Sequence, residues 1–541
     1  MKKLLRNLFA GAGALLAVGF AQQASASHYQ ASDLTYTNIS PNIFVVNLKL
    51  YRDCTGASAP YSATLNIKSL SCNSGRNITM NKVGGNRIGD PYCASIPKSC
   101  STTGRTNYEE VVFNATVTFT TTEQACPEWI MSWQECCRPN TANLIGQDNF
   151  YTEAMVRLGN TQNSSPEFSQ FNIPIPFVNY NQPILLSLNA TETDGDSLVY
   201  SLVDPLKGNN DPVPYKNYAG ETLFNADSTK VAFLQAGTFS STYPIISYTV
   251  DWNQPGNLAT PVQKFMFDSR TGSLGFIPIK YDPNSASAAG TNKYALAVKI
   301  DEFRTINGVP TKVGSVRRDM LINVIDCGPN QNPKIAAPVA NGQPITETDV
   351  INLRPGTPLT FQFAAADGNT ADVLSVQTDA STILPGAIFT RSTANQPTGT
   401  ISWTPTANDV RNQIYYFHVT VLDDACPVKG FQTHTFGVRV SATGGVTGTS
   451  ELTVSKNIFS AYPNPFSQEL NFKVNLQTKA ESLKIYNILG QQVDQISLAN
   501  TGLGEQKLRW ENAGKYAAGT YVAKLVSADK TVQTLKFTKL Q

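Results

Sequence analysis

Acidic residues gather at places in the sequence where the surrounding pattern also predicts a turn. Glu192, Asp194 and Asp196 alternate within a glycine-containing segment, and Asp301 with Glu302 follows a later apolar stretch. Calcium takes about six to eight oxygen ligands, mostly from carboxylates and carbonyls. Asp-Gly-Asp is also ordinary turn chemistry. The set Glu192, Asp194, Asp196 and Asp301 is therefore a candidate metal site, and calcium is the one cofactor that the sequence suggests.

A second acidic group repeats this arrangement later in the chain. Asp367 stands in a segment similar to that of Asp194, and Asp423 with Asp424 ends a strand-like stretch that should bring both residues near it. The first group, in residues 190–196, resembles the acidic loop of cadherin repeats. That resemblance implies carboxylates holding calcium at one end of a β-sandwich. The acidic linker that joins cadherin repeats is missing here, so the resemblance does not extend to a rigid calcium-bound joint.

Catalytic residues are not indicated. The three histidines, His28, His418 and His434, lie in strand-like segments without a nucleophile motif nearby. The sequence has no Gly-x-Ser-x-Gly elbow, no His-Glu-x-x-His motif and no glycine-rich phosphate loop before a helix. A carboxylate pair on a β-sandwich could serve a glycosidase, but no pair stands out. We predict that the protein is not an enzyme.

The elements that must position these residues are strands. Apolar residues recur at every second position in 44–50, in 63–67 and in several later segments, which is typical of half-buried strands. Trp129, Met131 and Trp133 also share one face of a strand, and we interpret them as core rather than as a sugar-binding stripe. The fold class is therefore all-β: tandem immunoglobulin/cadherin-like β-sandwiches with a small C-terminal β-sandwich.

Internal repeats set the expected domains. Residues 186–196 are echoed by 361–369, and 271–278 are echoed by 398–405. A chain of 541 residues is also too long for one core. We predict a signal peptide at 1–26, a cysteine-rich sandwich at 27–160, a cadherin/immunoglobulin-like sandwich at 165–327, an immunoglobulin-like sandwich at 328–441, a Gly/Thr/Ser linker at 442–456 and a terminal domain at 457–541.

The first residues have the pattern of a secretory signal peptide. Lys2, Lys3 and Arg6 precede an apolar run, and Ala24 and Ala26 form a small-residue cleavage site. The run is shorter than the roughly 20 apolar residues that a membrane span needs, and no later stretch reaches that length. We therefore expect an exported chain without a transmembrane segment.

The charge of the chain excludes some partners. There are 42 basic and 40 acidic residues, and removal of Lys2, Lys3 and Arg6 leaves 39 against 40. This balance and the lack of a basic patch argue against nucleic acid. The charges are spread unevenly, because 11 basic and 6 acidic residues follow Ser455. A basic end of this kind is compatible with an anionic partner such as outer-membrane lipopolysaccharide.

Nine cysteines in an exported chain predict disulfides. A metal site is not expected, because no Cys-x-x-Cys pair occurs. Cys327 and Cys426 should lie at the same end of one sandwich, and we predict that they pair. Cys136 and Cys137 are adjacent and should point to opposite faces of a strand, so we expect each to bind a different partner. The pairing of the remaining cysteines is left open: Cys54, Cys72, Cys93, Cys100, Cys126, Cys136 and Cys137.

The last 85 residues have three motifs in a fixed order. They are Tyr462-Pro463-Asn464-Pro465-Phe466, a strand and turn ending at Gly490, and a strand that begins with Gly519 and contains Tyr521. This segment resembles the C-terminal sorting domain (type A) of type IX secretion cargo. The resemblance implies that the secretion machinery is a partner. It also implies that the protein is secreted or held at the outer-membrane cell surface.

The function expected from these features is an adhesive or structural binding role at the cell surface. The segments around Cys126 and Cys136 also resemble modules of surface proteins from gliding bacteria, which favours adhesion or gliding motility as the context. Two alternatives remain open. One is a carbohydrate-binding protein of a polysaccharide-use system, with an extracellular glycan as partner, and the other is a secreted hydrolase with an unrecognised site.

Overall fold

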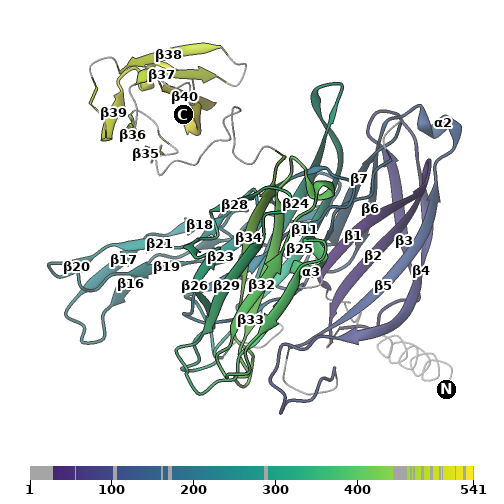
Figure 1. The fold of residues 1–541 in the computed structure, drawn as a ribbon, viewed down its shortest axis with the longest axis horizontal. Helices are drawn as coiled ribbons and strands as arrows, with labels where there is room; N and C mark the ends of the chain where they lie inside the picture. The colour runs from purple at the N-terminus through teal and green to yellow at the C-terminus, as the bar shows by residue number, and fades with distance from the viewer. Residues whose placement is uncertain are drawn as a thin grey trace, which may run out of the picture. The chain divides into compact units, whose positions relative to one another are not determined.

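The chain folds into two compact units, residues 1–444 and 445–541, which are described separately. We describe them from a computed structural model (Figure 1). The described residues are 29–54, 56–100, 106–159, 162–168, 173–284, 290–442 and, from 460 to 539, all except 463–465, 467–468, 477–479, 488–490, 499–500, 503, 518 and 528–531.

Eight strands of the first unit pair into a closed ring. The ring closes because one strand, β25, pairs with β7 through residues 314–316 and with β1 through residues 318–320. In order around the ring the strands are β1 (Tyr29–Ser40), β2 (Ile43–Asp53), β5 (Tyr108–Thr118), β4 (Gly75–Ile88), β3 (Ser62–Ser69), β6 (Glu128–Glu135), β7 (Phe150–Arg157) and β25 (Val309–Ile325).

Alternation along these strands directs apolar side chains into the ring. In β3 every second residue is buried, and Leu65 and Ile67 have no exposed surface. Trp129, Met131 and Trp133 on β6 are at most 2% exposed. The interpretation of these aromatic residues as core is therefore confirmed. A short helix, α2 (Thr121–Gln124), precedes β6 and is capped by Thr120.

The ring is continuous with strands that lie between β7 and β25 in the sequence. β24 (Lys293–Ile306) pairs along β25, β12 (Ser197–Val203) pairs with β24, and β9 (Phe177–Asn179) pairs with the end of β25. The structure thus differs from the predicted boundary at 160–165. Residues 27–160 supply only seven of the eight ring strands, so they cannot close a core without β25.

Short strands fill the segment between β7 and β24. In Figure 1 the strands labelled β16 to β21 form an arm at the left that projects away from the ring. They are β8 (Glu167–Phe168), β10 (Ile184–Ser187), β11 (Ala190–Thr191), β13 (Leu206–Gly208), β14 (Asp211–Pro212), β15 (Asn217–Tyr218), β16 (Glu221–Phe224), β17 (Val231–Leu234), β18 (Gly237–Thr238), β19 (Tyr248–Val250), β20 (Leu258–Ala259), β21 (Pro261–Gln263), β22 (Met266–Phe267) and β23 (Ser273–Phe276).

Residues 334–440 form a two-sheet sandwich with its own core, in which Phe361, Phe417 and Phe436 contact one another. It also contains the short helices α3 (Ala380–Ile383) and η2 (Ala407–Asp409). One sheet has the order β27 (Gln343–Pro344), β26 (Lys334–Ala340), β29 (Leu359–Ala366), β32 (Thr398–Trp403), β31 (Ile388–Arg391). The other has the order β28 (Val350–Leu353), β34 (Phe431–Val440), β33 (Tyr415–Leu422), β30 (Ser375–Thr378).

The second unit is a smaller sandwich of two sheets, with one short helix, η3 (Ala513–Lys515). One sheet is β35 (Ser460–Tyr462), β36 (Leu470–Leu476), β39 (Gly504–Trp510). The other is β38 (Gln492–Ser497), β37 (Ala480–Asn487), β40 (Gly519–Ser527), β41 (Val532–Lys539). The all-β fold class and the small C-terminal sandwich are confirmed.

Candidate functional site

The acidic loop after β11 is held in its turn by one of its own carboxylates. Glu192 accepts hydrogen bonds from the backbone N–H groups of Asp194, Gly195 and Asp196, at 2.6, 2.6 and 2.7 Å. Gly195 has φ +84°, a conformation that glycine adopts without strain. The Glu192 carboxylate therefore shapes the loop, and these three bonds occupy much of its capacity to accept others.

An arginine lies where a cation was expected. Arg304 on β24 donates two hydrogen bonds to Asp196, at 2.6 and 2.7 Å, and lies 4.0 Å from Asp194. It also donates to the side-chain oxygen of Asn163 at 2.9 Å. Bidentate pairs of this kind are strong and specific. The hydrogen bonds that Arg304 donates to Asp196 raise the pKa of Arg304, so its guanidinium stays charged.

Asp301 does not join this group. It and Glu302 are neighbours on β24, and successive side chains of a strand point to opposite faces. Asp301 pairs with Lys312 at 2.5 Å and with Lys299 at 3.4 Å. Glu302 lies where Asp301 was expected, with a carboxylate oxygen within 4.8 Å of carboxylate oxygens of Glu192 and Asp196. The placement of Asp301 was wrong because the strand register decides which neighbour faces the loop.

Glu302 is a neutral carboxylic acid at neutral pH. The side chain has no exposed surface, and burial raises its pKa to about 9. Its Oε2 accepts a hydrogen bond from Asn163 at 3.1 Å. Its Oε1 is buried without a hydrogen-bond partner among the described residues.

The group of Glu192, Asp194, Asp196 and Glu302 does not fit calcium, because two of its carboxylates already have partners. Arg304 binds Asp196, and three backbone N–H groups occupy Glu192. It does not fit a glycosidase either, although clustered carboxylates are the feature that the hydrolase alternative needed. Glu302 is 0% exposed and Asp196 is 4% exposed, so a polymer cannot reach them.

The residues of the later acidic group lie together more nearly as the sequence predicted than those of the first group do. Asp367, Asp372 and Asp423 bring one carboxylate oxygen each within 4.8 Å of the others, whereas Asp424 accepts a hydrogen bond from the backbone N–H of Val373. Burial raises the pKa of Asp423 to about 6 and also raises the pKa values of Asp367 and Asp372. The oxygen-only donor set is the type that calcium prefers. Calcium at this group stays a prediction.

The cysteines form four disulfides, and two expectations about them were wrong. Cys426 pairs with Cys93 rather than with Cys327, which is a buried free thiol. Cys136 and Cys137 pair with each other. The other bridges join Cys54 to Cys100 and Cys72 to Cys126. The Cys327–Cys426 prediction failed because it assumed that the sandwich closes on itself, whereas its β33–β34 hairpin reaches the segment that carries Cys93.

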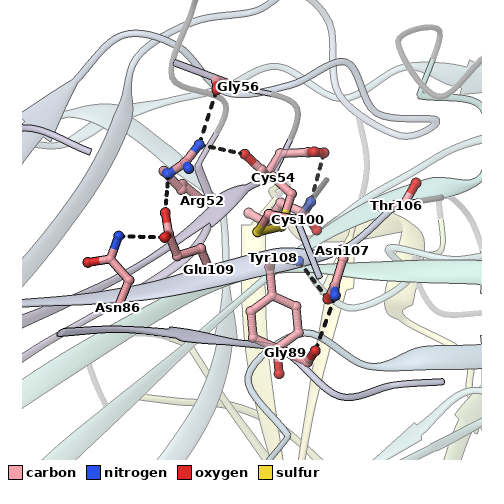
Figure 2. Close-up of a disulfide and its surroundings, with 12 residues drawn as sticks. Arg52, Cys54, Gly56, Asn86, Gly89, Cys100, Thr106, Asn107, Tyr108 and Glu109 are labelled. Carbon is pink, nitrogen blue, oxygen red and sulfur yellow. Dashed lines mark hydrogen bonds and ion pairs between the residues drawn. A yellow bond between two sulfur atoms is a disulfide. The ribbon is translucent and has the colours of Figure 1, made fainter. Parts of the chain in front are cut away.

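The segment that carries Cys93, residues 89–100, is fixed at both ends; we call it the Cys93 segment. Figure 2 shows the Cys54–Cys100 disulfide beside Asn107, whose side chain donates to the backbone oxygen of Gly89 at 3.1 Å. Figure 2 also shows Arg52, which donates to Glu109 at 2.6 Å and to the backbone oxygen of Gly56 at 3.1 Å. The disulfide and the Asn107 hydrogen bond connect the Cys93 segment to residues beside the ends of β2 and β5, and the Arg52 contacts hold those ends together.

The Cys93 segment also contacts the 334–440 sandwich beyond its disulfide. Cys93 N–H donates to the oxygen of Pro427 at 3.1 Å, and Lys429 N–H donates to the oxygen of Pro91 at 3.2 Å. Beside this junction lies a cavity of about 640 Å³. Its charged lining residues are largely paired with one another, as in Arg318 with Asp33 at 2.6 Å and Lys429 with Asp90 at 3.3 Å.

The two described histidines are structural. His418 is 2% exposed, and its Nδ1 lies 2.6 Å from Asp379 Oδ2. Its Nε2 is buried without a hydrogen-bond partner among the described residues. The second, His434, contacts Glu347 and accepts a hydrogen bond from Ile335 N–H at 3.3 Å. As the strand-like pattern predicted, His418 lies on β33 and His434 on β34, while His28 lies outside the described residues.

Two residues of the sorting motif, Phe466 and Tyr521, belong to the core of the second unit. Phe466 and Tyr521 are 1% and 6% exposed and both pack against Trp510, at ring distances of 5.9 and 5.7 Å. Gly519 begins β40. Sequence reasoning did not single out Trp510, although its place in an alternating strand was a signal. Outside the described residues lie Ala24, Ala26, Pro463, Asn464, Pro465 and Gly490.

Comparison with known families identifies this unit. Residues 460–539 match the family of the secretion system C-terminal sorting domain. No curated protein matches the sequence. Within the part of the chain that the structure describes, no helix has the length and apolar character to cross a membrane. The match at residues 460–539 shows that the chain carries the sorting domain of type IX secretion cargo, and this domain indicates export with attachment at the cell surface or secretion.

Solved structures similar to the chain are distant. The N-terminal four immunoglobulin domains of Dscam1 are 10% identical, with 95% of this chain and 99% of that chain covered and a TM-score of 0.15. Zebrafish RET cadherin-like domains 1 to 4 are 11% identical, with 68% and 98% covered and a TM-score of 0.14. The endo-fucoidan hydrolase MfFcnA4 is 13% identical, with 70% and 44% covered and a TM-score of 0.13. At these scores the similarity carries no argument about function.

Proposed function

We propose that the protein is an adhesive surface protein. The sorting domain delivers it, and the body, residues 29–442, is a cross-linked binding module that keeps its shape while it is pulled. The single observation that carries this proposal is the Cys93–Cys426 disulfide, which joins positions 333 residues apart. It connects the ring to the last sandwich before the sorting domain.

The mechanical consequence follows from chain length. An extended residue spans roughly 3.3–3.6 Å, so the 333 residues between the two cysteines would extend by on the order of 1,100 Å. The disulfide prevents this extension because force that enters near Val440 passes through the bridge into the Cys93 segment. Cys54–Cys100 then passes it on to the end of β2. A protein that holds a cell to a surface needs this resistance.

Single-molecule pulling of the mature chain from its two ends tests the proposal. We expect the oxidised body to extend by about 1,100 Å less than the Cys93→Ser/Cys426→Ser variant. The matched control is Cys72→Ser/Cys126→Ser, which removes a bridge that closes a loop of only 54 residues. Equal extension of wild type and the Cys93→Ser/Cys426→Ser variant would contradict a mechanical role.

Carbohydrate binding is the second candidate function, and one observation favours it. A cavity in the first unit is lined by four tyrosines. No comparable observation among the described residues favours the hydrolase alternative. Lipopolysaccharide as a partner is supported only by the excess of basic residues after Ser455.

A further inference from the structure

A cavity of about 560 Å³ opens in the first unit, where four separate segments meet. The residue that follows β9, the β15 strand, the turn after β23 and the start of β24 supply one tyrosine each: Tyr180, Tyr218, Tyr281 and Tyr294. The volume falls within the range of roughly 300–1,000 Å³ that is usual for sites of small ligands.

The aromatic rings form two groups on this lining. Tyr180 and Tyr281 have ring centroids 6.1 Å apart at an interplanar angle of 38°. Tyr218 lies 5.0 Å from Phe239, which in turn lies 6.2 Å from Tyr294. Tyr180 is 37% exposed, so part of its ring faces solvent. Rings arranged in this way offer apolar faces to a flat or ring-shaped ligand and hydroxyls at their edges.

The charges on the lining cancel. Two lysines and two acids line the cavity, and Lys280 pairs with Glu221. Lys216 donates a hydrogen bond from Nζ to the backbone oxygen of Thr141 at 2.6 Å. This bond keeps the ammonium group at the wall of the cavity. Because no net charge remains, the cavity has no preference for an anion or a cation. The other polar lining groups are neutral: Thr141, Asn217, Thr291 and Asn292.

Backbone hydrogen bonds hold the tyrosines in place. Tyr180 N–H donates to Ile325 O at 2.7 Å, and the next residue, Asn181, donates to Pro278 O at 2.7 Å. These two bonds join β9, the end of β25 and the turn before Tyr281. Tyr218 pairs with Gly237 in the β15–β18 ladder. The backbone that carries these rings is therefore fixed before a ligand arrives, which lowers the entropic cost of binding.

We propose that this cavity binds an uncharged sugar chain. A pyranose ring packs its apolar face on Tyr180 and Tyr281, and its hydroxyls hydrogen bond to the phenols and to the neutral amides and hydroxyls of the lining. A charged glycan gains nothing from this lining. This inference deepens the proposed function, since it names a ligand class for the binding module.

Calorimetric titration of the full mature chain tests the assignment. The probes are two neutral oligosaccharides, cellohexaose and mannohexaose, and one acidic one, hexagalacturonate. We expect a neutral probe to bind with a Kd of about 1 mM or tighter. Tyr180→Ala and Tyr281→Ala should each weaken binding at least about tenfold, and Tyr281→Phe should retain it because the ring remains.

Tyr61→Ala is the matched control, because Tyr61 is 90% exposed and does not line the cavity. It should bind as the wild type does. The assignment is overturned if neither neutral probe binds, if hexagalacturonate binds more tightly than both, or if the two alanine variants bind unchanged. Cell adhesion that persists in Tyr281→Ala but fails without the Cys93–Cys426 disulfide would reject the sugar site and leave the adhesive function standing.

Discussion

Arg138 and Asp319 form a bidentate ion pair across 181 residues, at 2.8 and 2.7 Å, with both side chains completely buried. Arg318, which precedes Asp319 on β25, donates two hydrogen bonds of 2.6 Å to Asp33. Because adjacent side chains of a strand point to opposite faces, both faces of β25 are held by buried pairs. The strand that closes the ring is therefore held by a buried ion pair on each face.

Removal of one partner of the buried pair should be costly. We expect Asp319→Ala to lower the free energy of unfolding by about 3–5 kcal/mol, because Arg138 is left buried without its partner. Arg87→Ala is the control, since Arg87 is 82% exposed in its pair with Glu110 and should change stability by less than about 1 kcal/mol. Guanidinium unfolding followed by tryptophan fluorescence measures both. Equal losses would show that the buried pair has no special role.

The stability of the body should fall as the pH rises, and Glu302 should be a cause. Its pKa is about 9 in the folded protein and near 4.5 in the unfolded chain, so the folded state holds an extra proton between these values. Stability then decreases by up to about 1.4 kcal/mol per pH unit across that window.

Glu302→Gln isolates this contribution. The amide keeps an acceptor for Asn163 and cannot titrate. Asp423, whose pKa is raised to about 6, contributes to the pH dependence of the unfolding free energy mainly below pH 6.5. The comparison of Glu302→Gln with wild type is therefore clearest between pH 6.5 and 9. We expect the difference in unfolding free energy between variant and wild type to grow in favour of the variant across this range. A constant difference would mean that Glu302 is already ionised.

Thiol counting tests the disulfide assignment. Four bridges leave Cys327 as the single free thiol, 8% exposed, with its pKa raised to about 11 by burial. We expect Ellman's reagent to detect one thiol per chain after denaturation without reductant and to react slowly with the native protein. Cys327→Ser should show none. A thiol count of three in the denatured wild type would mean that one of the bridges is absent.

Arg304 should prevent calcium from binding to the acidic loop of residues 192–196. We expect Arg304→Gln to leave Asp194 and Asp196 without their cation and to make the melting temperature rise with added calcium by mass action. Lys312→Gln is the control, because it removes a cation from Asp301 on the same hairpin but away from the loop. An identical response to calcium in both variants and the wild type would contradict this role of Arg304.

The strands were predictable from the sequence, but their pairing across the chain was not. Alternation at Leu65 and Ile67, or at Leu483 and Ile485, depends only on neighbouring residues, and all four are buried. The closure of the ring by β25 depends on contacts such as Ala31 with Met320. No local pattern marks such a contact, which is why residues 27–160 were expected to fold alone.

The candidate site was predictable only where its residues are close in sequence. Glu192, Asp194 and Asp196 lie together because they share one turn, and the sequence shows that turn. The choice between Asp301 and Glu302 needed the strand register, and the role of Arg304 needed its partner 108 positions away. The partner of Cys426 likewise lies 333 positions away, in a segment with no apparent relation to the sandwich.

Adhesion under flow tests the central claim most directly. Cells of the native host would carry either the wild-type chain or Cys93→Ser/Cys426→Ser, with equal surface levels verified by antibody, and shear would be raised until they detach. The proposal predicts that cells with the variant detach at lower shear than cells with the wild type, and that cells without the chain adhere least. Equal detachment of all three would contradict an adhesive role for this protein.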